Sequence, residues 1–183
     1  IPPTHQDVQQ RTASCRFGLQ MRQPNNEAYL LPADATPSML EACLPLSSLY
    51  SSIGSIDAKQ AIVFMDACFS GSRRENGMIV SARGVAIKPK KDMVTGNVVV
   101  FSAADGSETA YPYKEKGHGL FTYFLLKKLK ESRGNVTLGD LADYVKTNVS
   151  QKSIVVNNKS QTPTISSSAQ MQDVWRTMKL FRK

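Results

Sequence analysis

One thiol and one carboxylate stand close together in the chain, and their types could do chemistry jointly. Cys68 follows Asp66 by two positions, and both come directly after the apolar run 61–65. An ionised thiol is a nucleophile, and a carboxylate can hold a cationic group beside it. Alternate side chains of an extended chain point to the same side, so both would face the same space. The pair predicts nucleophilic chemistry, although a small buried core cysteine is the simpler interpretation of the thiol.

Two apolar strands are expected to position this pair. The run 61–65 has five apolar residues in succession, which predicts a strand buried on both faces. A second apolar run, 97–102, predicts a neighbouring strand and ends in the small and polar segment 103–109. Open α/β sheets place their chemistry beyond the carboxyl ends of such strands. The thiol and the carboxylate are therefore expected to lie near the segment after residue 102.

Three stretches have apolar residues at spacings of three and four, which predicts helices. They cover residues 36–50, 119–131 and 137–145, and Pro45 should break or kink the first of them. Alternation of helices with apolar strands predicts a three-layer α/β fold.

Shorter segments are predicted from local composition. Residues 27–32 predict a short strand that ends at a proline, residues 154–156 predict a brief strand, and residues 161–164 lead into a last edge segment. Residues 1–20 show neither a helical nor an alternating pattern, and we interpret them as irregular.

Composition excludes several classes of protein. The chain has 183 residues, of which 41% are apolar, and this is enough for one domain with a sizeable core. No apolar run reaches the ~20 residues that cross a bilayer, and the N-terminus lacks the basic and apolar regions of a signal peptide. We therefore expect a soluble protein without a membrane partner. The sequence does not begin with Met, and its compartment stays undetermined.

The cysteines and the charge narrow the choice further. Cys15, Cys43 and Cys68 are an odd number without a Cys-x-x-Cys pair, which argues against a disulfide framework and a zinc site. The net charge is +8, but the basic residues are spread along the chain without interleaved aromatic residues. A solvated basic surface is favoured over a nucleic-acid interface. We expect no nucleic-acid partner, no metal and no cofactor.

The segment around the thiol resembles the nucleophile strand of caspase-like cysteine peptidases, a superfamily that includes bacterial caspase homologues, metacaspases and paracaspases. The resemblance rests on an Asp-x-Cys-x-Ser-Gly motif after an apolar strand, here residues 66–71. Three further segments look like family segments: 98–110 like the strand and loop beside the specificity pocket, 115–123 like the run that opens the small-subunit helix, and 27–34 like the segment after the catalytic His. Together these motifs extend the resemblance over roughly residues 21–175.

The resemblance implies a three-layer caspase-like sandwich with a mostly parallel central sheet, in which the N-terminal strands and helices of the family are lacking. Residues 1–20 would be irregular and unlike the family, and residues 21–183 would form a catalytic domain. Within this domain, the large-subunit part would span about 21–71, a basic loop about 72–96, and the small-subunit part about 97–183.

The same resemblance implies a Cys–His peptidase that acts on a peptide or protein substrate. Cys68 is then the nucleophile, and its backbone N–H would donate to the oxyanion. Asp66 is similar to the acid that lies beneath the P1 side chain in metacaspase-like members, which implies cleavage after Arg or Lys. Ser102 and Ala103 would form a pocket wall through backbone contacts. An N-terminal cap or structural carboxylate is the competing interpretation of Asp66.

The general base of the family is absent from its expected position. That His stands in a Gly-His-Gly motif about fifty residues before the nucleophile, where this chain has Leu19 followed by Gln20. Leucine cannot accept a proton. The histidines present are His5 and His118, and we interpret the latter as a helix-start residue. Three explanations stay open: a pseudoenzyme, a truncated or frame-altered product, or a site that a complementary chain or N-terminal segment completes.

Two functional hypotheses follow. The first is a cysteine-type endopeptidase with Arg/Lys preference that is inactive or incomplete in this chain. The second is a non-catalytic caspase-like module that binds peptides or proteins in the same cleft. Arg83, Lys90 and Lys91 lie between the two apolar strands, where family members are often cut into two subunits. They are hypothetical self-processing sites, and an uncut basic loop is the alternative of equal weight.

Overall fold

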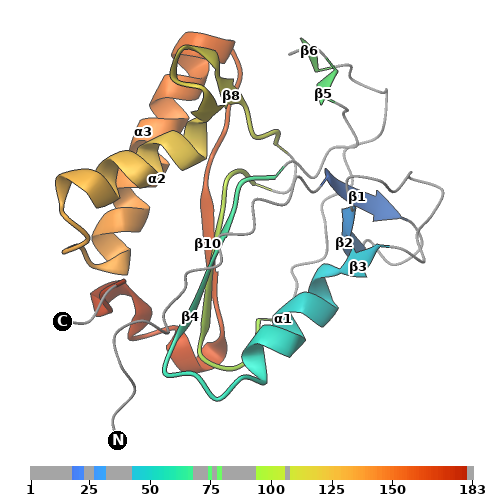
Figure 1. Cartoon of the computed structure of the whole chain (residues 1–183), viewed down its shortest axis with the longest axis vertical. Coiled ribbons are helices and arrows are strands. Elements are labelled where there is room, and N and C mark those ends of the chain that lie inside the picture. Colours follow the sequence, from blue (N-terminus) through green and yellow to red (C-terminus); the bar gives the residue numbers. More distant parts are fainter. Residues whose placement is uncertain are drawn as a thin grey trace, which may run out of the picture.

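Two parallel apolar strands form the centre of the molecule (Figure 1). They are β4 (Ala61–Met65) and β7 (Val98–Ser102), and the antiparallel strand β10 (Thr164–Ser167) pairs with the other side of β7. The two predicted apolar strands, their pairing and the last edge segment are therefore confirmed. The computed structural model describes residues 18–22, 27–31, 43–67, 74–75, 78–79, 94–105 and 108–180.

Burial differs between the two parallel strands. The first four residues of β7 are at most 2% exposed, because strands flank it on both sides and helices cover both of its faces. In β4 only Met65 is buried. Within the described residues β4 pairs with β7 alone, so it lies at the edge of this sheet. The prediction that residues 61–65 are buried on both faces is therefore wrong for 61–64.

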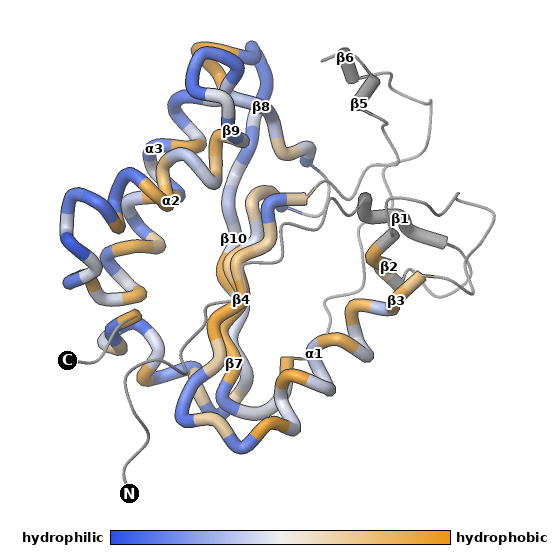
Figure 2. Tube along the Cα trace, in the orientation of Figure 1, coloured by the Kyte–Doolittle hydropathy of each residue, from blue (hydrophilic) through white to orange (hydrophobic). Residues whose placement is uncertain are grey.

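Helices cover both faces of the sheet and complete three layers (Figure 1). They are α1 (Leu46–Gly54), α2 (Leu120–Glu131) and α3 (Leu138–Asn157). Val99 and Phe101 belong to the core formed with α2 and α3, whereas Val98 and Val100 belong to the core on the α1 side, as the alternation of a strand requires. Figure 2 shows the apolar residues concentrated on the central strands. The predicted three-layer α/β fold is confirmed, and the described sheet is mixed, with one parallel and one antiparallel pair.

A small antiparallel sheet lies beside α1 (Figure 1). It contains β1 (Gly18–Arg22), β2 (Glu27–Leu31) and β3 (Leu44–Pro45), in that order. The strand predicted over 27–32 is confirmed as β2. The prediction that residues 1–20 are irregular is wrong for 18–20, because pairing with β2 forms a strand that has no local pattern of its own. Residues 1–17 lie outside the described residues.

The helix predicted over 36–50 starts later than expected. α1 begins at Leu46, and Pro45 is its N-cap with φ of −59°, the value to which the proline ring is restricted. Proline ends β3 and precedes α1, so residues 44–45 are strand and the prediction of helix there is wrong. Residues 32–42 lie outside the described residues.

α2 and α3 begin where the sequence predicted. Their N-caps are Gly119 and Thr137. The strand predicted over 154–156 is wrong, because these residues form the last turn of α3 before Asn158 ends it with a left-handed φ of 51°. The intrinsic preference of β-branched residues for strands is a small energetic effect. The hydrogen bonds of a long helix outweigh it here.

The remaining regular elements are short. They are the hairpin of β5 (Arg74–Glu75) and β6 (Met78–Ile79), the hairpin of β8 (Pro112–Tyr113) and β9 (His118–Gly119), and 3₁₀ turns at Lys114–Lys116, Ala169–Met171 and Trp175–Thr177. Across the described ranges, no helix combines the length and the apolar character needed to span a membrane.

Candidate active site

The parallel pairing of β4 and β7 brings three predicted site residues together. Met65 is the register partner of Ser102, and the N–H of Ala103 donates to the carbonyl of Met65 at 2.8 Å. Asp66 follows Met65 directly, so it lies at the same sheet edge as Ser102 and Ala103. Cys68 lies outside the described residues, as do Arg83, Lys90 and Lys91.

Asp66 caps the N-terminus of α2. Its Oδ2 accepts hydrogen bonds from the hydroxyl of Thr122 at 2.6 Å and from the N–H of Thr122 at 3.4 Å. Thr122 is the third residue of α2, where N–H groups have no partner within the helix. A carboxylate at this end is also favoured by the helix dipole. This geometry agrees with the capping interpretation of Asp66.

Gly119 makes room for this carboxylate. A Cβ atom at position 119 would lie 2.2 Å from Oδ2 of Asp66, far inside van der Waals contact. Gly119 is the N-cap of α2 and has an extended backbone, with φ of −66° and ψ of 151°. The requirement for glycine at this position is therefore steric, and any larger residue would push Asp66 away from the helix.

The carboxylate of Asp66 is held and yet remains exposed. Asp66 is an exposed residue, and both of its hydrogen bonds to Thr122 use Oδ2. The ion pairs of Lys127 with Glu131 and of Arg176 with Asp143 lie elsewhere, and among the described residues no cationic side chain pairs with Asp66. A fixed, exposed carboxylate without a cationic partner can receive an ammonium or guanidinium group.

The segment after β7 is held by residues that the sequence did not single out. The side chain of Gln161 is fully buried; its Nε2 donates to the carbonyl of Ala103 at 2.9 Å, and its Oε1 accepts the N–H of Tyr111 at 2.8 Å. The carboxylate of Glu108 accepts the N–H and, at 3.1 Å, the hydroxyl of Thr162. Nothing local in the sequence marks these residues, because their partners lie at least 50 residues away in the chain.

The candidates for a general base are placed as follows. His118 is exposed and lies in β9, paired with Tyr113, two residues before α2 begins. It therefore lies just before the helix start that the sequence predicted, and in a strand. Leu19 lies within β1 and pairs with Leu30 of β2, and His5 lies outside the described residues. Within those residues, no three His, Cys, Asp or Glu side chains gather as a metal site would require.

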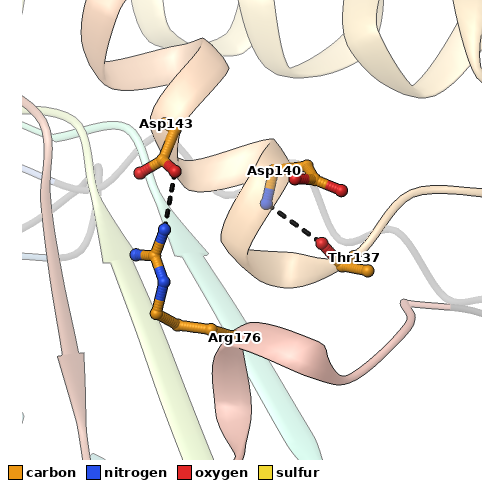
Figure 3. Close-up of polar contacts among 4 residues, drawn as sticks. All are labelled: Thr137, Asp140, Asp143 and Arg176. Carbon is orange, nitrogen blue, oxygen red and sulfur yellow. Dashed lines mark hydrogen bonds and ion pairs between the residues drawn. The ribbon is translucent and has the colours of Figure 1, made fainter.

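A second polar region lies at the N-terminus of α3 (Figure 3). Thr137 Oγ1 accepts the N–H of Asp140 at 3.1 Å, and Arg176 pairs with Asp143 at 2.6 Å. A hollow of about 520 Å³ is lined by Thr137, Asp140 and Asp143 of this region and by Lys128 in the C-terminal half of α2. Asp66 caps the opposite end of α2, so this region is separate from the candidate active site.

Comparison with known proteins identifies the class. Residues 14–174 match the family profile of the caspase domain. Because this match covers most of the chain, the protein belongs to the caspase domain family of cysteine peptidases. The matched region starts at residue 14, before the point where the resemblance in the sequence begins.

A solved structure supports the same fold. Caspase-1 from Spodoptera frugiperda is similar with a TM-score of 0.50 and 16% sequence identity, over 76% of this chain and 54% of that chain. The likeness concerns the fold, and this chain spans about half the length of that structure. No curated protein sequence matches this chain.

Proposed function

We propose that this domain is a caspase-type cysteine endopeptidase that hydrolyses peptide bonds after Arg or Lys in protein substrates. Cys68 is the nucleophile, Asp66 receives the cationic P1 side chain, and Ser102 and Ala103 form the pocket wall. The observation that carries the proposal is the exposed carboxylate of Asp66, anchored through one oxygen at the edge where β4 and β7 end. A buried or paired carboxylate at this position would not be able to bind a substrate cation.

The chemistry needs a proton shuttle as well as a thiolate. The Cys68 thiolate attacks the scissile carbonyl, backbone N–H groups stabilise the oxyanion, and the amine leaves with a proton from a general acid. Water then hydrolyses the thioester and regenerates the thiol. In this chain Leu19 occupies the expected position of the family's His. We therefore expect negligible turnover from this chain alone.

Turnover of fluorogenic peptides with Arg, Lys or Asp at P1 tests the proposal. The chain as it stands should be inactive on all three. Leu19→His with Gln20→Gly should give cleavage after Arg and Lys, and the additional change Cys68→Ala should abolish this cleavage. Cleavage after Asp, or activity that survives Cys68→Ala, would contradict the assignment. Strong cleavage by the unaltered chain would instead point to His118 or His5 as the base.

The alternative is a non-catalytic caspase-like module that binds peptides or proteins in the same cleft. It is favoured by the position of Leu19 inside the regular pairing of β1 with β2. This alternative predicts that the Leu19→His, Gln20→Gly chain stays inactive while basic peptides still bind, which calorimetry with an Arg-containing peptide would detect.

We further propose that Arg83, Lys90 or Lys91 is a self-processing site, because each offers a basic P1 residue between β4 and β7 in sequence. Processing requires an active site, so it is expected in the base-restored chain and not in its Cys68→Ala form. Intact-mass measurement of both forms decides the matter, and a single uncut chain in an active protein would contradict it.

A further inference from the structure

Gln161 connects to both elements that hold Asp66. Through Nε2 it binds the carbonyl of Ala103 at 2.9 Å, and the N–H of Ala103 is bound to the carbonyl of Met65 at 2.8 Å. Met65 is the last residue of β4 and precedes Asp66 directly. The first connection therefore runs from the Gln161 amide to the backbone that carries Asp66.

The second connection runs to the helix that Asp66 caps. Oε1 of Gln161 accepts the N–H of Tyr111 at 2.8 Å, and the carbonyl of Tyr111 accepts the N–H of Leu120 at 3.0 Å. Leu120 is the first residue of α2, and Thr122 binds the Asp66 carboxylate from the same turn. One side chain thus links the end of β4 to the start of α2.

The choice of an amide follows from what must be bound. Gln161 and Ala103 are 0% exposed and Tyr111 is 8% exposed, so water has little access to replace a lost partner there. A primary amide offers a donor and an acceptor at one tip and can satisfy a carbonyl and an N–H together. An apolar side chain of similar size would remove the hydrogen bonds that Gln161 makes to these two backbone groups.

Gln161 is itself anchored by α3. Its N–H donates to the hydroxyl of Ser153 at 3.1 Å, and that hydroxyl donates to the carbonyl of Ser150 at 3.0 Å. Ser153 is also 0% exposed. The next residue, Thr162, binds the Glu108 carboxylate through its N–H and hydroxyl. The link therefore rests on a rigid helix and fixes the segment after β7 at several points.

We propose that Gln161 is a positioning residue for substrate recognition: it sets the separation between the end of β4 and the start of α2 at which Asp66 receives a cationic P1 side chain. This inference rests on the proposed function of Asp66. Without the amide, Ala103 and Tyr111 lose a shared partner, and the carboxylate loses its fixed position relative to the pocket wall.

The test compares the rates at which two reagents alkylate Cys68, with the labelled residue identified by peptide mass mapping. A peptidyl-arginyl chloromethyl ketone requires the pocket, whereas iodoacetamide reports thiol reactivity alone. In Gln161→Met the ratio of these rates should fall about tenfold, which corresponds to losing one buried hydrogen bond. The control is Thr137→Ala, which removes the N-cap of α3 at the helix end remote from Gln161. In this variant the rate ratio should stay within about twofold of that of the unaltered protein, a difference smaller than the loss of one hydrogen bond. If Gln161→Met does not fold, Gln161→Asn serves, because its shorter amide cannot span both groups.

Hydrogen exchange at the amides of Ala103, Tyr111 and Leu120 separates this inference from the proposed function. Exchange should accelerate in Gln161→Met and stay unchanged in Thr137→Ala. Unchanged exchange in Gln161→Met would overturn the positioning role, whatever the alkylation rates. Faster exchange with an unaltered rate ratio would overturn its link to the pocket. Equal reactivity of arginyl and aspartyl ketones with the unaltered protein would overturn the proposed specificity, and the pocket role with it.

Discussion

The carboxylate of Asp66 is held in place by hydrogen bonds and is also open to solvent. It is anchored, because Thr122 and the N-terminus of α2 hold Oδ2, and it is exposed. Because the carboxylate is already anchored, binding a cation has a smaller entropic cost of ordering the side chain. Its exposure gives the cation access from solvent. The sequence predicted both a capping and a substrate-binding interpretation as alternatives, and the geometry is compatible with both at once.

Thr122→Val should destabilise the protein by about 1 kcal/mol, the typical value of an exposed cap or a single hydrogen bond. The change removes the hydroxyl that donates to Asp66 and keeps the shape of the side chain. Thr122→Ser keeps the hydroxyl and serves as the matched control, with stability close to the unaltered protein. Urea denaturation measures both, and equal stability of the valine and serine variants would contradict the capping role. In combination with Asp66→Asn, the two losses should be less than additive.

At the scale of elements, the sequence predicted best where a local pattern and tertiary packing agree. β7 and α2 have strong patterns and are buried as expected, with residues 98–101 and Phe121 in the core. β1 has no such pattern and forms through pairing with β2. Residues 154–156 have a strand-like composition, yet they continue α3, and Val155 is 75% exposed there. In β1 a partner strand decided the structure, and at 154–156 the hydrogen-bond ladder of a long helix did so.

Thr137→Ala should cost about 1 kcal/mol of stability, because the N-cap side chain satisfies an N–H that the helix leaves without a partner. Here Thr137 Oγ1 accepts the N–H of Asp140 at the start of α3 (Figure 3). Thr137→Ser retains the acceptor, so its stability should stay close to that of the unaltered protein. Thermal or urea denaturation of the pair checks this, and an alanine variant as stable as the serine variant would refute it.

For the whole molecule, the site is assembled from segments far apart in sequence. The meeting of Asp66 with Ser102 and Ala103 could be predicted, because parallel neighbours end at the same sheet edge. The hydrogen bonds of Thr122 and Gln161 could not be predicted from the sequence. Their partners lie 50 or more residues away in the chain, and no local pattern marks either residue. The match to the caspase domain spans all of these segments, since it covers residues 14–174.

The most direct test measures which ketone alkylates Cys68 faster, a peptidyl-arginyl or a peptidyl-aspartyl chloromethyl ketone. The thiolate displaces chloride in this reaction and no amine must be protonated, so the test does not depend on a His at position 19. We expect the arginyl reagent to react at least about tenfold faster, as a single charge-assisted contact would give, and Asp66→Asn to abolish this preference. Thr122→Val, which keeps the charge of Asp66, should retain part of it. Equal rates, a faster aspartyl reagent, or a preference that survives Asp66→Asn would contradict the account.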